Sequence, residues 1–443
     1  TGVEHHPQNI PDEIGYDRIR DAFRSKSEIA YQGAVQRLDN KRTHLKQNPK
    51  PADNAVVPEF KRMPPAVWIG PSALTIPCPV TDMEQLSNRL SKVFSDYPEL
   101  FNHCVKVYQK RVDYYRLTSE GQKILQPDTV FHITARASIK TDGNEVKTEY
   151  YRLHVGGIND LPSEDALIGE LHRFAEYMQQ KSQAKAVEDL YIGPVLYEDD
   201  AAMELLAEKI ADYSHSYWIS IRNQSDRKHR YLGKQVFPPA LSVCQLGNDS
   251  VYNGVKLLGY RQVDADGTKP KTLPIIEKGI LKHMLTGRTP SLGCPASTGN
   301  EHFDGLSRTL ETRYTAGVFR VTSNRPVPYS KLYKRFLKAA KKAGLEHTYI
   351  IRKNRTSPYA LIRVDLSTGK EELVEGNYNS PSREQFKRMH AISKEENVYN
   401  LDPAGGKGLG IISPKAILLE DMELDITPNR ARHIDEAFYE LRH

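Results

Sequence analysis

The sequence predicts an α+β fold, with helices packed on an antiparallel sheet in residues 1–188 and a β-rich, barrel-like domain in residues 189–443. Three observations predict it. Apolar residues recur at helical spacing in the first part of the chain. Alternating strands flank a Thr-Asp-Gly-Asn hairpin signal at 141–144. From residue 191 onward, short apolar runs alternate with turn glycines, and this combination of elements is typical of the α+β class.

Three helices are expected in the first part of the chain. Residues 12–45 carry an apolar stripe, and the Asn-Pro-Lys-Pro sequence at 48–51 ends this helix because proline lacks the N–H that a helix interior requires. Thr81 and Glu84 form a capping-box pattern that opens a helix ending near residue 97. Ser163 is expected to cap the third helix, whose buried face carries apolar residues at helical spacing.

The remaining elements are mostly strands. Apolar and alternating runs predict strands at 105–112, 130–137, 146–155, 191–196, 349–351, 360–364 and 411–424. Helices are expected at 203–213 and at the lysine-rich segment 331–342, whose basic residues we interpret as its solvated face.

Composition limits the classes of function. A chain of 443 residues with 39% hydrophobic and 27% charged residues is ordinary for a globular protein of two or three domains. The net charge of +6 gives no argument for nucleic-acid binding, and no apolar run approaches the roughly 20 residues of a membrane span. The four cysteines form no C-x-x-C pair, which argues against a structural zinc knuckle. Because the chain starts at Thr1, we expect a processed, exported or periplasmic protein, with a cytoplasmic one as the alternative.

Few residues suggest chemistry by themselves. No two histidines are four residues apart, so the zinc-binding H-E-x-x-H helix is absent. Glu198 stands where a strand meets the start of a helix, in the acidic run 198–200, which a helix dipole favours without any ligand. Glu301, His302 and Asp304 form a small acidic and imidazole cluster. The glycine-rich segment 405–410 is interpreted as a plain loop, because a strand-like run follows it and a dinucleotide site would need a helix.

Several segments, taken together, resemble the TldD/PmbA family of metallopeptidase-like proteins, which were once called modulators of DNA gyrase. These segments lie in order over residues 191–426: the Tyr-Ile-Gly-Pro-Val-Leu-Tyr-Glu-Asp-Asp entry at 191–200, the Asp-Ala-Asp-Gly-Thr turn at 264–268 with the Ile-Glu-Lys-Gly-Ile-Leu-Lys run at 276–282, the small-residue segments at 297–300 and 322–324, and the closing strand at 412–424. The N-terminal part matches only in outline.

The resemblance implies a two-domain dimer that holds peptide in a cleft. In the active branch of the family, an H-E-x-x-x-H helix and a later cysteine bind zinc, and the glutamate acts as general base on the metal-bound water. Glu198 matches the glutamate, whereas Tyr197 and Ala202 stand at the histidine positions. Counting back from Pro414 puts the cysteine position near Asn400. The chain therefore resembles the branch without zinc ligands, and Glu198 would be a vestigial general base.

These observations lead to three hypotheses. The first is a non-catalytic subunit without zinc or any other cofactor, which binds peptide or unfolded protein and forms a homodimer or a heterodimer with a zinc-bearing TldD-like subunit. The second is an active metallopeptidase with atypical zinc ligands, for which Glu301 and His302 are the first candidates. The third is a stand-alone module that binds peptides at an exposed strand edge. None of the three calls for nucleic acid or for a membrane span.

Overall fold

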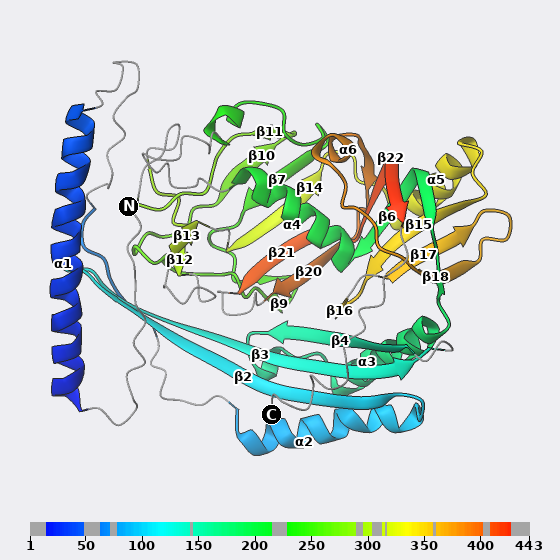
Figure 1. Ribbon diagram of the computed structural model, residues 1–443, viewed down its shortest axis with the longest axis horizontal. Coiled ribbons are helices and arrows are strands. Elements are labelled where there is room, and N and C mark those ends of the chain that lie inside the picture. Colours follow the sequence, from blue (N-terminus) through cyan, green and yellow to red (C-terminus); the bar gives the residue numbers. More distant parts are fainter. Residues whose placement is uncertain are drawn as a thin grey trace.

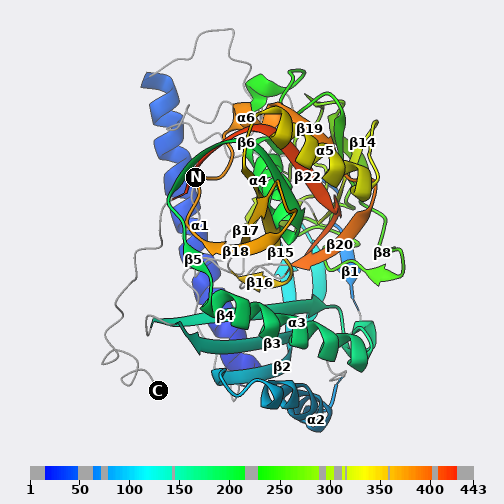
Figure 2. The ribbon, with the colours of Figure 1, turned by 90° about the vertical axis from the view of Figure 1, so that its right-hand side faces the viewer.

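The computed structural model describes residues 15–47, 63–70, 78–141, 145–214, 228–288, 296–303, 312–314, 317–357, 360–401 and 408–426. Over these ranges the protein is α+β, with six α-helices and several mixed sheets (Figure 1). This confirms the predicted fold class. Figures 1 and 2 show a first sheet with two helices on one side of the molecule and two larger sheets stacked beside it.

The first sheet is built on a long, curved pair of antiparallel strands. Its strands are β1 (Val67–Ile69), β2 (Phe101–Leu117), β3 (Lys123–Lys140), β4 (Val146–Val155) and the distant β16 (Thr356–Ser357). β2 and β4 both pair antiparallel with β3, as predicted, and the tip at 142–144 lies outside the described residues. β1 pairs in parallel with β3, so the sheet is mixed rather than purely antiparallel.

Two helices cover one face of this sheet. α2 (Val80–Ser91), followed by the 3₁₀ turn η1 (Lys92–Asp96), and α3 (Glu164–Ser182) bury apolar side chains such as Leu90 and Phe174 against β3. Ser163 caps α3 as predicted, because its hydroxyl accepts a hydrogen bond from the amide of Ala166 (3.3 Å). The capping box of α2 was wrong, because the helix already starts at Val80 and Thr81 lies inside it.

A seven-stranded sheet carries the first and the last of the segments that resemble the family, in β6 (Asp189–Asp199) and β22 (Ala416–Ile426). Its order is β19 (Met389–Ile392), β22, β6, β15 (His347–Lys353), β17 (Ala360–Asp365), β18 (Glu371–Glu375) and β5 (Lys185–Ala186). α5 (Tyr329–Lys342) packs on one face through Leu332 and Phe336. α4 (Asp200–Ser214) packs on the other face, beside the next sheet.

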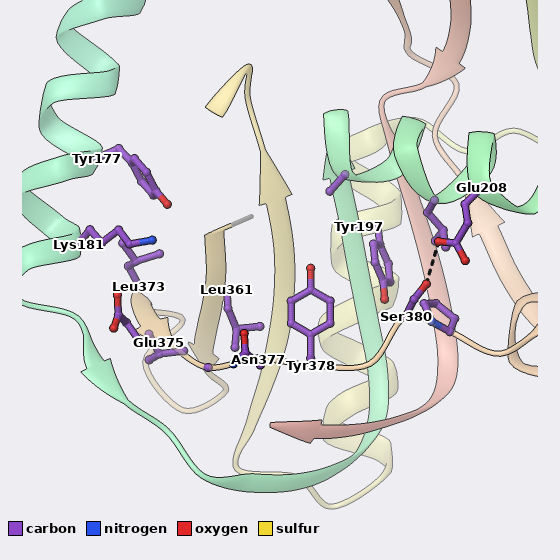
Figure 3. A pocket seen from close by; sticks show the side chains of 15 residues that line it. Tyr177, Lys181, Tyr197, Glu208, Leu361, Leu373, Glu375, Asn377, Tyr378 and Ser380 are labelled. Atoms are coloured by element: carbon purple, nitrogen blue, oxygen red, sulfur yellow. Dashed lines mark hydrogen bonds between the residues drawn. The ribbon is translucent and has the colours of Figure 1, made fainter. Parts of the chain in front are cut away.

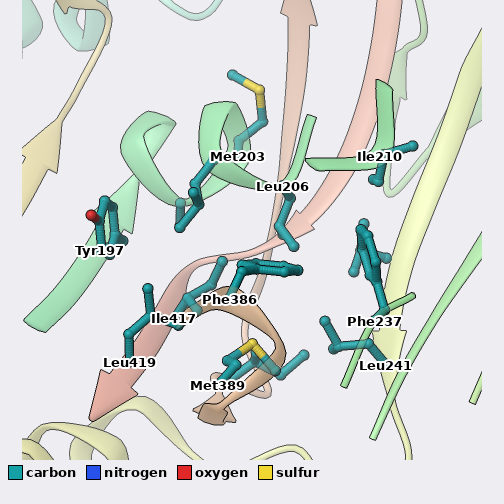
Figure 4. Close-up of a cluster of buried hydrophobic side chains, with 14 of the residues drawn as sticks. Tyr197, Met203, Leu206, Ile210, Phe237, Leu241, Phe386, Met389, Ile417 and Leu419 are labelled. Carbon is teal, nitrogen blue, oxygen red and sulfur yellow. The ribbon is translucent and has the colours of Figure 1, made fainter. Parts of the chain in front are cut away.

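A six-stranded sheet completes the larger core. Its order is β11 (Ile280–Leu281), β10 (Leu273–Glu277), β7 (Leu241–Gln245), β14 (Val318–Ser323), β21 (Leu409–Pro414) and β20 (Glu396–Leu401). Figure 4 shows side chains of α4, such as Leu206, meeting those of Phe237 and Phe386 in the shared core. Both large sheets are open in the described part of the chain, so the expected barrel-like closure is not found there.

Short elements connect these layers. They are the strands β8 (Val251–Tyr252), β9 (Val255–Lys256), β12 (Glu301–Phe303) and β13 (Thr312–Tyr314), the helix α6 (Arg383–Lys387), and the 3₁₀ turns η2 (Ile158–Asp160) and η3 (Lys228–Tyr231). β5 pairs with β18 and β16 pairs with β4, so strands cross the expected boundary at residue 188 in both directions. The division into 1–188 and 189–443 stays a prediction.

α1 (Tyr16–Gln47) confirms the first expected helix, but its apolar stripe is not buried. Phe23 is 62% exposed and Leu38 is 44% exposed. Figure 1 shows the helix at the margin of the molecule, and no described element packs extensively against it. None of the described helices is both long enough and apolar enough to cross a membrane.

Candidate functional site

Glu198 lies at the end of β6, two residues before α4 begins. Its side chain is buried on the face of the sheet that α5 covers, in register with Arg352 of β15. Arg352 Nε donates to one carboxylate oxygen (2.6 Å), and the hydroxyl of Tyr329, on α5, donates to the other. Burial raises the pKa of the Tyr329 phenol most, and the hydrogen bond to Glu198 and the charge of Glu198 raise it further. The carboxylate is thus held in a buried ion pair.

Tyr197 and Ala202, which the sequence resemblance matches to the family's two histidines, lie on the opposite face. Because successive side chains of a strand point to opposite faces, Tyr197 points away from Glu198 and into the core around α4. Ala202 is buried on α4 in the same core. Glu198 therefore does not share a space with the two positions that would hold a metal.

Asp199 and Asp200 complete the acidic run, and each has its own structural partners. Asp199 adopts a left-handed backbone conformation (φ 54°) and accepts a hydrogen bond from the amide of Asn397 (3.1 Å). Asp200 accepts from the backbone N–H of Arg355 (2.7 Å), and burial raises its pKa to about 6. The three acidic side chains of the run are directed to different partners, so they do not form one cation site.

Asn400, which stands near the cysteine position, is held elsewhere. Its amide accepts a hydrogen bond from the backbone N–H of Leu258 (3.0 Å) and donates one to the carbonyl of Lys256 (2.7 Å). Asn397 and Tyr399, which alternate with it on β20, form the side of that strand that reaches Asp199. Asn400 thus faces away from the start of α4.

The alternative cluster is only partly described. Glu301 and His302 are buried in β12, and Asp304 lies outside the described residues. The backbone N–H of Glu301 donates to Asp264, and its carboxylate lies 3.9 Å from Arg116. Asp264 also accepts hydrogen bonds from the backbone N–H groups of Asp266 and Thr268. The family-like turn at 264–268 is therefore held together by the buried carboxylate of Asp264.

The residues do not fit a zinc ion. Zinc in a peptidase needs three protein ligands, which are usually histidine, cysteine or a carboxylate. Of the three family positions, a core tyrosine and an alanine offer none of these, and the third is an asparagine whose amide is already bonded. Across the described ranges, no three His, Cys, Asp or Glu side chains are grouped to hold a metal ion.

A cavity of about 300 Å³ lies beside Tyr197 and α4, between α3, α4 and the end of β18. Figure 3 shows Tyr177 and Lys181 of α3 on one side of it, Tyr197 and Glu208 on the other, and Tyr378 between them. Its remaining lining is mostly apolar and comes from α4, β17, β18 and residues 376–381. Such a mixture of apolar walls and a few polar groups is typical of a binding site.

Comparison with known proteins agrees with this arrangement. Residues 192–326 match the family model described as the PmbA/TldA metallopeptidase C-terminal domain. Through this segment the chain belongs to the PmbA/TldD family. The family recognised from the sequence is thereby confirmed. No curated protein matches the chain in sequence.

Three solved structures share the fold. A proposed modulator of DNA gyrase from Thermotoga maritima is 14% identical with a TM-score of 0.56, over 83% of this chain and 78% of that one. Another, from Bacteroides thetaiotaomicron, is 15% identical with a TM-score of 0.53, over 79% and 72%. TldE from Thermococcus kodakarensis is 11% identical with a TM-score of 0.50, over 86% and 81%. At these identities the likeness concerns the fold alone.

No pattern in the sequence indicates the cavity. Its polar residues come from three separate stretches, around 177–181, 197–208 and 375–380, and no short motif joins them. Tyr197 was singled out only because it replaces a histidine. That it lines a cavity follows from the packing of α3 and α4 against β18.

Proposed function

We propose that this PmbA/TldD-family protein has no zinc centre and binds peptide or unfolded protein in the cavity beside α4 as a non-catalytic subunit. The observation that carries the proposal is the cavity itself, which lies beside the position of the family's zinc motif and is lined there by Tyr197 and Ala201. A site without metal ligands can still recognise a peptide, but it lacks the ion that would activate water.

In this proposal Glu198 matches the family's general base and has become a structural residue. Its carboxylate is engaged by Arg352 and Tyr329 on the face of the sheet away from the cavity. A buried carboxylate that is already paired with a guanidinium cannot take up a proton without losing that ion pair. This supports a non-catalytic role over an active site with atypical ligands.

The experiment joins metal analysis with a cleavage assay. Purified protein is analysed for zinc by mass spectrometry and incubated with a pool of hexapeptides, whose binding and cleavage are both measured. We expect binding without stoichiometric zinc and without cleavage. Stoichiometric zinc together with cleavage that Glu198→Gln abolishes would overturn the proposal, provided that Glu371→Gln, which touches the same Arg352, keeps full activity.

We further propose that α1 joins this subunit to a second copy or to a zinc-bearing member of the family. A helix of 32 residues gains little stability in water unless its apolar face is covered. Tyr16, Phe23 and Leu38 lie within about 60° of one another around the axis of α1, so they share one face, and all three are exposed. Such a stripe suits packing against another helix.

The assembly is tested by light scattering of the full chain, alone and co-expressed with a zinc-bearing homologue. We expect a dimer, and we expect Phe23→Asp to return it to 50.3 kDa. Ile29→Asp is the matched control, because Ile29 is equally exposed but lies off the stripe. A monomeric wild-type chain that still binds peptide would favour the stand-alone module, for which β2, an edge strand of its sheet among the described residues, offers a strand.

A further inference from the structure

A charged cluster of five side chains lies behind the cavity, where α3 and β4 meet β18. It consists of Lys147, Glu149, Tyr177, Lys181 and Glu375, of which the last three line the cavity. Lys147 forms an ion pair with Glu375 Oε2, and Lys181 forms one with Glu149 Oε1. All four charged side chains are at most 12% exposed. Neither the fold nor the family motif requires such a cluster.

Three acceptor atoms of this charged cluster have no hydrogen-bond partner among the described residues. They are Glu149 Oε2, Glu375 Oε1 and the phenol oxygen of Tyr177. A buried acceptor without a partner destabilises the fold, and native structures contain only a few such atoms per 100 residues. Two of the three, Glu375 Oε1 and the Tyr177 oxygen, belong to residues that line the cavity, and they call for a donor that the described residues do not supply.

The electrostatics show that the three groups share one environment. Burial raises the pKa of Glu149 to about 7, Lys181 works against this shift, and the charge of Glu375 adds to it. Burial also raises the pKa of the Tyr177 phenol, and the charges of Glu149 and Glu375 raise it further. The charges of both carboxylates thus act on the phenol, and the charge of Glu375 also acts on Glu149.

The cavity favours a cationic donor over an anionic one. Its lining contains two carboxylates, Glu208 and Glu375, and one cation, Lys181, so its formal charge is −1. The whole chain, in contrast, carries a net charge of +6. The rings of Tyr177, Tyr197 and Tyr378 add surfaces that attract cations. The apolar walls of the cavity can cover the aliphatic stem of a side chain such as lysine. The cavity volume of about 300 Å³ is at the lower limit for ligand pockets, so it suits one or two residues rather than a long peptide.

We propose that the cavity binds a positively charged amine of a peptide, either its α-amino group or a lysine side chain. The accepting atoms are Glu375 Oε1 and the Tyr177 oxygen, whose residues line the cavity, and an ammonium group has N–H donors for both. The buried carboxylate of Glu149 lies behind them in the same charged cluster. This inference rests on the proposed peptide-binding function and names the chemical group that the site selects.

The experiment uses a fluorescent hexapeptide pool in four forms: unmodified, N-acetylated, with every lysine replaced by norleucine, and with both changes. Binding to the full chain is followed by fluorescence anisotropy. We expect the doubly modified pool to bind at least about tenfold more weakly, because a hydrogen bond to a charged group contributes that much. The singly modified pools tell which of the two amines is recognised.

Tyr177→Phe is the decisive variant. Its hydroxyl makes no hydrogen bond with any described residue, so the fold should be kept or slightly stabilised while amine binding falls. Glu375→Gln should also weaken amine binding, and the exposed Glu372→Gln on the same strand is its matched control.

Two different results separate this inference from the proposed function. If all four pools bind equally well, or if Tyr177→Phe binds the unmodified pool as wild type does, the amine inference is overturned and peptide binding stands. If no pool binds, the proposed function fails and the inference fails with it.

Discussion

Replacing Glu198 by alanine should destabilise the fold by about 2–4 kcal/mol. Removing one partner of a buried ion pair costs roughly 3–5 kcal/mol, because the other charge stays buried. Here Arg352 is one-third exposed and keeps Glu371 at 3.2 Å, which reduces that figure. The buried Tyr329 hydroxyl also loses its acceptor, which adds about 1–3 kcal/mol to the reduced cost of breaking the ion pair.

The assay is urea unfolding followed by circular dichroism. The free energies of unfolding of wild type and variant are compared with a common m-value, the slope of the free energy against urea concentration. Glu371→Ala is the matched control, since it removes the exposed partner of the same Arg352 and should cost less than about 1 kcal/mol. A change below about 0.5 kcal/mol for Glu198→Ala would refute the structural role. Such a result would return Glu198 to the list of candidate catalytic residues.

Three further predictions concern other buried groups. His132 and His154 meet with their Nδ1 atoms 3.0 Å apart, and burial lowers both pKa values from 6.5 to about 4. The neutral pair contributes stability above pH 6.5 that is lost as the pH falls toward 4, so we expect a loss of up to about 4 kcal/mol, about 2 kcal/mol per histidine, in urea unfolding between pH 7 and pH 5. An equal loss in His132→Phe would contradict this expectation. Asp264→Ala should cost at least about 3 kcal/mol by the same measurement, because three backbone N–H groups lose their acceptor, and Asp264→Asn should cost less. Gly259→Ala should lower the yield of folded protein and its unfolding midpoint, since the new Cβ would lie 1.4 Å from the carbonyl oxygen of Gly317; a wild-type midpoint would contradict this.

Local patterns in the sequence were sufficient for many of the elements. The cap of α3 at Ser163 and the paired strands β3 and β4 depend on residues close together in the chain, and both were predicted. The capping box at Thr81 failed because a match of residue types does not set where a helix starts. The open sheets could not be told from a barrel, because closure depends on which strand edges meet.

The sequence by itself determined the fold class, the family and the lack of histidine at Tyr197 and Ala202, since these follow from residue identity and short-range spacing. Only the tertiary structure decided what those positions do. Glu198 contacts Tyr329, which is 131 residues away in the chain, and Arg352, which is 154 residues away. The cavity is likewise lined by residues of α3 and β18, which are far apart in the sequence. The physical reason is that burial, and with it the strength of every charge–charge contact, is fixed by packing between distant segments, which no local pattern encodes.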